Sequence, residues 1–191
     1  MAITTGRLTL DDYLIPFTES SEIVLLANKE LALKRERLAV FTFPPDLFPN
    51  GIKRLGRDWA TKQMVIGIQS PRGDRWDTVR IPDVVVLPLD QWRELQNREA
   101  VIRLGEPPPL LIVEVVSEST RGVDYRAKRA EYSVLDIPEY WIIDSLSEQV
   151  TLLTLTEGWY DAQEFTGSDV VRSPTFPDLA QSVEEILKGE L

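Results

Sequence analysis

The segment between Leu110 and Asp144 constrains the fold of this chain more than any other part of the sequence. It consists of an apolar strand, LLIVEVVS, then a helix, RGVDYRAKRAEYSVL, and then a second apolar strand, EYWIIDS. Strands joined through a helix are expected to lie parallel in one sheet, with a right-handed crossover. The segment therefore predicts an α/β fold, with a mixed sheet flanked by helices on both faces.

The segments around this unit predict the rest of the sheet. QMVIGIQ and DTVRIPDVVVLP are rich in Val and Ile and flank the turn SPRGDRW, so they predict a β-hairpin. LDQWRELQNREAVI is typical of a short helix, and the residues after Asp144 indicate a trailing hairpin and a final helix. The length of 191 residues suits a single domain over residues 1–191, with residues 1–52 as a helical and loop part.

The sequence contains neither cysteine nor histidine. The lack of cysteine excludes disulfides and thiolate metal sites and favours a reducing, cytoplasmic location. The lack of histidine excludes Ser-His-Asp and Cys-His catalysis and histidine metal clusters. Hydrolytic chemistry would have to use carboxylates, lysine, tyrosine, hydroxyls and a hard metal ion. No run of residues approaches the length of a membrane span, so no membrane partner is expected.

Charge is unevenly distributed along the chain. The net charge of −10 disfavours loose binding to nucleic acid, because contacts with phosphate need a positive surface. The region from residue 53 to residue 80 is nevertheless rich in basic side chains, and it predicts either a local basic groove or a mixed, solvated surface. These basic residues are Lys53, Arg54, Arg57, Lys62, Arg72, Arg75 and Arg80.

Glu114 is a single carboxylate inside the apolar strand. Side chains alternate between the two faces of a strand, so Glu114 shares its face with Ile112 and Val116. Burying an isolated ionised carboxylate there costs on the order of several kcal/mol. Glu114 must therefore be paired, protonated, bound to a metal or located at the open end of the sheet. The structural alternative is a glutamate paired with an arginine in the core.

Asp83 is a second candidate, because it follows Pro82 at the start of an apolar strand. An aspartate at such a position can simply cap a turn. Neighbouring strands lie about 4.8 Å apart, however, so Asp83 and Glu114 could reach one divalent ion from adjacent strands. Ligation by oxygen alone suits Mg²⁺, or Mn²⁺ in its place, and does not require histidine.

The Pro-Asp at one strand and the Glu in a later apolar strand resemble the PD-(D/E)xK superfamily, whose fold is restriction-endonuclease-like. VRIPDVVVL, PPPLLIVEVVSEST, DYRAKRAEY and IPEYWIIDS more closely resemble the Uma-two family of “putative restriction endonucleases”. The resemblance extends from about Lys53 to the C-terminus. Before it, SSEIVLLANKELALKRERLAVF favours a helix, with a hairpin as the alternative, and Glu30 is the candidate for any group that this helix contributes.

In the superfamily motif a lysine stands two residues after the glutamate, but here Val116 occupies that place. The resemblance implies that the lysine has moved to the following helix, where Lys128 is the candidate. Asp124 and Tyr132 are four residues away on either side, so they share a helix face with Lys128. The alternative is an ordinary surface pair of Asp124 and Lys128, worth about 0.3–0.5 kcal/mol. The adjoining face would pack on the sheet; its members are Ala127, Ala130 and Val134.

The resemblance implies a metal-dependent endonuclease that hydrolyses phosphodiester bonds of DNA. The sequence does not decide whether the chain forms a homodimer. In this interpretation Mg²⁺ is held by Asp83, Glu114 and the backbone carbonyl near Val116, and it activates water. Lys128 neutralises charge on the phosphate or positions the water. Asp124 and Tyr132 support Lys128 from the same helix. The alternative is a binding or regulatory module that keeps the nuclease fold and cuts nothing.

Overall fold

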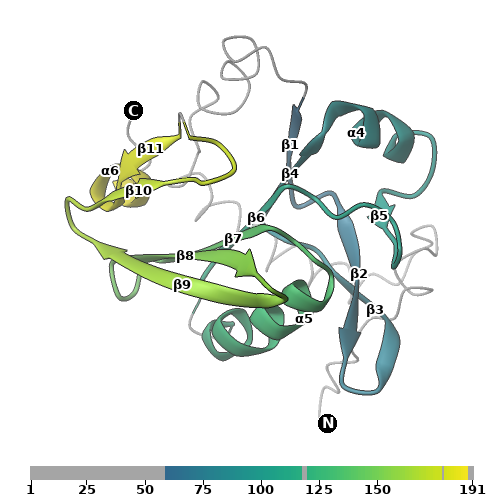
Figure 1. Ribbon diagram of the computed structural model, residues 1–191, viewed down its shortest axis with the longest axis horizontal. Helices are drawn as coiled ribbons and strands as arrows, with labels where there is room; N and C mark the ends of the chain where they lie inside the picture. The colour runs from purple at the N-terminus through teal and green to yellow at the C-terminus, as the bar shows by residue number, and fades with distance from the viewer. Residues whose placement is uncertain (1–58, 118–119, 178, 189–191) are drawn as a thin grey trace, which may run out of the picture.

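A six-stranded mixed sheet forms the centre of the computed structural model, which describes residues 59–117, 120–177 and 179–188 (Figure 1). Its strands lie in the order β1-β4-β6-β7-β8-β9. Their bounds are β1 Trp59–Gln63, β4 Val84–Pro88, β6 Leu111–Val115, β7 Glu139–Asp144, β8 Gln149–Thr156 and β9 Trp159–Thr166.

The strands β6 and β7 are parallel, with Ile112 opposite Tyr140 and Val115 opposite Ile143. The chain between them contains a π-helical turn, η2 (Val123–Lys128), which continues into the helix α5 (Arg129–Val134). The other strand pairs of this sheet are antiparallel. The strand–helix–strand unit predicted from the sequence is confirmed, and so is the mixed α/β sheet.

A second, three-stranded sheet, here called the small sheet, lies beside the central one, with its strands in the order β3-β2-β5. The strands β2 (Gly67–Arg72) and β3 (Arg75–Arg80) form an antiparallel hairpin, and β5 (Val101–Ile102) pairs with β2 in parallel. The turn between β2 and β3 contains Gly73, whose φ of +63° lies in the left-handed region that favours glycine. The turn predicted at SPRGDRW is therefore confirmed.

The segment DTVRIPDVVVL is not one strand of the central sheet, contrary to the prediction. It divides at residues 81–83: β3 ends at Arg80 in the small sheet, and β4 begins at Val84 in the central one. Pro82 lies at the division, where it lacks the N–H that a central strand would donate. The chain thus passes from one sheet to the other immediately before Asp83.

Apolar side chains cover both faces of the central sheet. On one face Val113, Trp141 and Ile143 pack against the C-terminal part of the chain, which comprises β10 (Val170–Arg172), β11 (Ala180–Ser182) and α6 (Val183–Lys188). The other face packs against α5, the small sheet and α4 (Leu89–Leu95). The predicted helices on both faces are confirmed. Ile112 and Val116 belong to the second face, so Glu114 points toward α5.

The helical segment formed by η2 and α5 turns its charged side toward the sheet, contrary to the prediction. Ala130 and Val134, which were expected to pack inward, are exposed. The buried side carries Asp124, Lys128, Glu131 and Tyr132. This arrangement is tolerated because these polar groups bind one another and groups on the strands, so no large apolar face is needed there.

The predicted first helix with Glu30, together with Lys53, Arg54 and Arg57, lies outside the described residues. Within the described residues, none of the helices has the length and apolar character needed to cross a membrane.

Trp141→Ala should test the packing of the central sheet. Trp141 is 1% exposed in the cluster that includes Val113 and Ile143, so its truncation should lower the free energy of unfolding by about 3–5 kcal/mol. Trp159→Ala is the matched control, because Trp159 is 78% exposed and its loss should change stability by no more than about 0.5 kcal/mol. Urea denaturation followed by circular dichroism measures both. Equal losses would contradict the described core.

Candidate active site

Asp83 lies at the point where β4 stops pairing with β6. The last pair of the two strands joins Val84 to Val113. Just beyond it, Oδ2 of Asp83 accepts a hydrogen bond of 2.8 Å from the backbone N–H of Val115. The buried Asp83 carboxylate thus continues the hydrogen-bonded ladder and is fixed beside the strand that carries Glu114.

Glu114 receives two partners from the helical segment. Its Oε1 lies 2.8 Å from Nζ of Lys128 and accepts a hydrogen bond of 2.8 Å from the Tyr132 hydroxyl. The same ammonium lies 2.6 Å from Oδ1 of Asp124. The side chains are 8% exposed for Lys128 and 1% for each carboxylate, so this is a buried ion triad and not the surface pair that the sequence left as an alternative.

The charge on Lys128 follows from its two partners. Burial by itself would lower the pKa of Lys128, but the neighbouring carboxylates of Glu114 and Asp124 outweigh that effect and raise the pKa above its ordinary value. The side chain is therefore an ammonium at neutral pH. A positive charge is thus present beside Glu114, although it comes from the helix and not from the strand position of Val116.

Two tyrosines border this triad. Tyr132 donates to Glu114, and Tyr140 on β7 donates a hydrogen bond of 3.0 Å to the backbone carbonyl of Asp124. Burial raises the pKa of both phenols well above the ordinary value, and carboxylates add to the shift. The Tyr140 ring is within electrostatic reach of Glu114, Asp124 and Asp83. Both tyrosines therefore remain neutral donors. Tyr140 is buried in the apolar cluster on this face and also holds η2 in place.

A second buried ion pair adjoins the first, and no pattern in the sequence predicts it. Glu131 on α5 accepts two hydrogen bonds of 2.7 Å from Arg80, one from Nε and one from Nη2. Its Oε2 also accepts a hydrogen bond of 2.9 Å from the Ser70 hydroxyl on β2. The sequence left open that Glu114 pairs with an arginine in the core. In the structure that arginine, Arg80, binds Glu131, whereas Glu114 binds Lys128 and Tyr132. No local spacing relates Arg80 or Ser70 to Glu131, because they come from different strands.

The Asp83 carboxylate binds the amide of Val115, the residue between Glu114 and Val116 at the end of β6. Val116 follows this strand, and its N–H is bonded to the carbonyl of Ile143 at 2.8 Å. Among the described residues, no three acidic side chains converge in the manner of a complete metal site. The donors that are present, two buried carboxylates and backbone carbonyls, fit Mg²⁺, which keeps several waters and needs only one or two carboxylates. The roles of Asp83, Glu114 and Val116 as ligands remain predictions.

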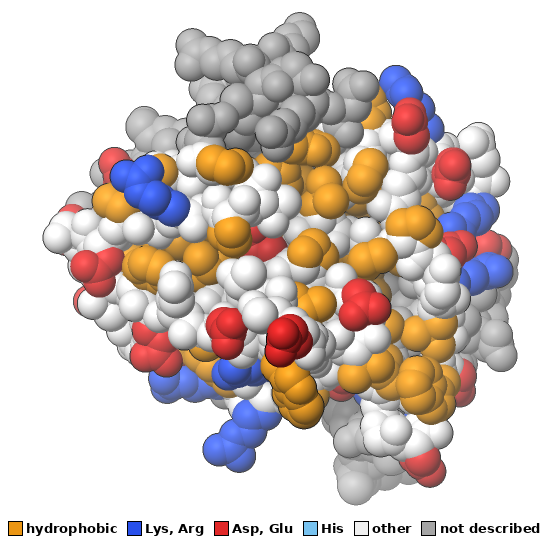
Figure 2. All heavy atoms as spheres, viewed as in Figure 1, with side chains coloured by type: hydrophobic (Ala, Val, Ile, Leu, Met, Phe, Trp, Pro, Cys, Tyr) orange, Lys and Arg blue, Asp and Glu red, His pale blue; other side chains and the backbone are white. Residues whose placement is uncertain are grey.

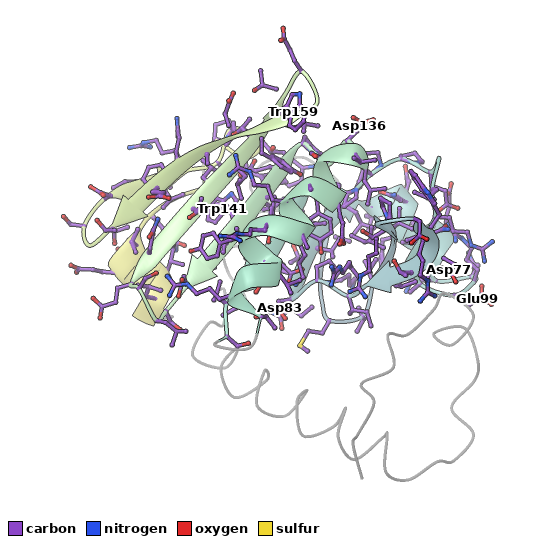
Figure 3. The ribbon with its side chains drawn as sticks, turned by 90° about the horizontal axis from the view of Figure 1, so that it is seen from below. Asp77, Asp83, Glu99, Asp136, Trp141 and Trp159 are labelled. Atoms are coloured by element: carbon purple, nitrogen blue, oxygen red, sulfur yellow. The ribbon has the colours of Figure 1, made fainter. Side chains whose placement is uncertain are left out.

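A cavity of about 420 Å³ lies elsewhere, at the far end of α5. Its lining includes Ile68, Leu104 and Ile137, but none of the charged residues described above. Figure 3 shows the separation: Asp83 lies by the first turns of the helical segment, and Asp136, which lines the cavity, lies by its last turn. The chemistry of the carboxylates favours the Asp83 end as the candidate site.

Two of the basic side chains of residues 59–80 are paired with carboxylates. Arg75 is paired with Asp77 at 3.0 Å, and Arg80 is turned inward to Glu131. On the face drawn in Figure 2, basic and acidic side chains are interspersed around the rim. Within the described part of the chain, the mixed surface is the better interpretation.

Comparisons with known proteins agree with this architecture. The Uma2 family model, described as “Putative restriction endonuclease”, matches residues 52–184. A crystal structure of “a putative nuclease belonging to DUF820” from Anabaena variabilis ATCC 29413 is similar, with a TM-score of 0.56 and 15% sequence identity. The alignment covers 94% of this chain and 97% of that one. At this identity the similarity shows the fold alone. No curated protein matches the sequence.

Lys128→Met should reveal how far the fold depends on the buried ammonium. The substitution keeps most of the side-chain volume but leaves Glu114 and Asp124 without their counter-charge, so the free energy of unfolding should fall by about 3–5 kcal/mol at neutral pH. In the control Lys62→Met, the lost ammonium lies 4.2 Å from the centre of the Trp92 ring and its removal should cost at most about 1 kcal/mol.

Guanidinium denaturation at neutral pH measures both variants. Adding Asp124→Asn to Lys128→Met removes one of the two uncompensated charges and should restore part of the loss. A loss in Lys128→Met no larger than in Lys62→Met would show that the ammonium is not buried between the carboxylates.

Proposed function

The chain belongs to the Uma2 family, described as “Putative restriction endonuclease”, whose model matches residues 52–184, and from this premise we propose that it is a metal-dependent endonuclease acting on DNA. The proposed reaction is hydrolysis of a phosphodiester bond. The proposed metal is Mg²⁺, or Mn²⁺ in its place.

Two buried carboxylates carry this proposal. Asp83 and Glu114 are each 1% exposed, and the Asp83 carboxylate binds the amide of Val115, the residue that follows Glu114 on β6. Carboxylate oxygens are ligands that Mg²⁺ prefers, and this ion needs only one or two of them because it keeps several waters.

Each residue has a separate part in the proposed site. Asp83, fixed by the Val115 amide, and Glu114 would hold the metal, with the backbone carbonyl of Val116 as a further ligand. A bound metal supplies an activated water and stabilises the charge of the phosphate in the transition state. Lys128 places a permanent positive charge beside Glu114, where it can stabilise the developing charge on the phosphate. Tyr132 keeps the Glu114 carboxylate oriented through its hydrogen bond.

Positive side chains for the DNA backbone are available on the outer side of the same helical segment. Arg121 and Arg126 are exposed there, and Arg121 lies 3.3 Å from Asp144 at the end of β7. Guanidinium groups bind phosphates in a forked geometry. We propose that they support the DNA strand near the carboxylates. A cytoplasmic location and a homodimer remain predictions from the sequence.

A non-catalytic module with the same fold is the second candidate. The net charge of −10 and the mixed surface of the described residues favour it, because binding of nucleic acid generally needs a basic surface. Titration with Mg²⁺ or Mn²⁺ in a calorimeter, combined with a cleavage assay, separates the candidates, since the nuclease must both bind the metal and cut DNA.

The purified protein should nick plasmid DNA in the presence of Mg²⁺ or Mn²⁺, and a chelator should abolish the activity. Asp83→Asn and Glu114→Gln should lose both metal binding and cleavage, because each removes a charged ligand. Asp77→Asn and Glu99→Gln are matched controls, since both side chains are exposed and lie away from Asp83 (Figure 3), and both variants should cleave like the wild type.

The Lys128→Met/Asp124→Asn double variant should keep metal binding but lose about 10²–10³-fold in kcat, as expected when one stabilising group is removed from the transition state. Metal binding without cleavage of any DNA or RNA substrate would favour the non-catalytic module. Failure to bind a divalent metal would overturn the proposed site.

A further inference from the structure

Arg80 and Asp83 are the two ends of the short segment in which the chain passes from the small sheet to the central sheet. Arg80 is the last residue of β3, and Asp83 directly precedes β4. Each end binds a different part of the candidate site: Arg80 binds Glu131 on α5, and Asp83 binds the amide of Val115 on β6. Pro82 between them restricts the backbone, because its ring fixes φ. The segment therefore connects the helix that bears Lys128 with the strand that bears Glu114.

The contact at the Arg80 end has a fixed geometry. Both nitrogens that bind Glu131 do so at 2.7 Å, and the side chains are 12% exposed for Arg80 and 10% for Glu131. Ser70 on the neighbouring strand adds a third hydrogen bond to the same carboxylate. A forked guanidinium–carboxylate pair fixes orientation as well as distance, which a lysine in the same place could not do.

Net stabilisation is a weak explanation for this pair, because well-packed apolar residues often stabilise a core equally well or better. Its position suggests another role. Glu131 lies next to Tyr132 and less than one helical turn after Lys128, and both of these side chains contact Glu114. Burial would lower the pKa of Arg80, but Glu131 outweighs that effect, with smaller contributions from Tyr132 and Glu114. The guanidinium is thus charged and within electrostatic reach of the site.

We propose that Arg80 is a positioning residue: by its forked contact with Glu131 it holds α5 against the end of β3, where the chain crosses to the central sheet, and so sets where the Lys128 ammonium meets Glu114. The hydrogen bond of Asp83 to Val115 anchors the other end of the same segment. The inference rests on the proposed function only for its consequence in cleavage, because the placement of Lys128 can be measured without any reaction on DNA.

The direct test is the reactivity of the Lys128 amine toward an N-hydroxysuccinimide ester, with Lys62 in the same molecule as the internal reference and mass spectrometry as the readout. In the wild type Lys128 should be protected. In Arg80→Lys and Glu131→Gln the ratio of Lys128 to Lys62 labelling should rise at least about tenfold, because each variant loses the forked contact of a buried pair, which weakens the closed position of the helix.

The matched control is Arg98→Lys. Arg98 also binds both oxygens of a carboxylate, Glu106, at 2.8 Å, but this pair lies outside the candidate site. Its labelling ratio should equal that of the wild type. Circular dichroism identifies the variants that fold, and Arg80→Lys and Glu131→Gln give two independent readings. An unchanged Lys128 ratio in a folded variant of this pair would overturn the proposal.

The second test is an assay of DNA cleavage. Arg80→Lys should lower kcat about tenfold or more while the KM for DNA and the affinity for Mn²⁺ stay near the wild-type values, because the displaced group acts in the transition state and not in binding. The two hypotheses fail separately. A wild-type protein that cuts nothing leaves the labelling result intact, whereas an active protein with unchanged labelling retains the nuclease function and rejects Arg80 as a positioning residue.

Discussion

The buried carboxylate of Glu114 is the constraint on which the rest of the structure depends. An ionised group inside an apolar strand must find an opposite charge and hydrogen bonds within the protein, because water cannot supply them. The structure meets this need from the helical segment that follows the strand, through Lys128 and Tyr132. That segment must therefore turn its charged side inward, which is why Val134 and not Lys128 is exposed.

Further consequences extend from this pairing to the neighbouring elements. The inward-facing helix also buries Asp124 and Glu131, and each needs a partner of its own. Asp124 shares the ammonium of Lys128, while Glu131 draws Arg80 from the small sheet. The small sheet is thus joined to the helix by charge as well as by apolar packing. The burial of the Glu114 carboxylate is thus connected with contacts between two sheets and one helix.

The proposed chemistry uses the same features that solve the burial problem. In the proposed site the buried carboxylates of Asp83 and Glu114 would hold a divalent ion, and the ammonium that pairs with Glu114 would supply positive charge to a phosphate beside that ion. In this chain Asp83 directly precedes β4, and its carboxylate binds the amide of Val115 on the neighbouring strand β6, next to Glu114. In this proposal function and stability are linked at Lys128, since both would depend on the same ammonium.

The sequence by itself determined the strand–helix–strand unit and the face on which Glu114 lies, because the alternation of side chains along a strand is a local rule. Lys128 was the candidate because of the resemblance to the family, and the i, i+4 spacing placed it on one helix face with Asp124 and Tyr132. Only the tertiary structure decided that the charged face of the helix is the buried one and that the chain changes sheets before Asp83. Tertiary structure also paired Arg80 with Glu131. These contacts join residues far apart in the chain, and no local pattern of polarity or spacing records which distant side chain will neutralise a buried charge.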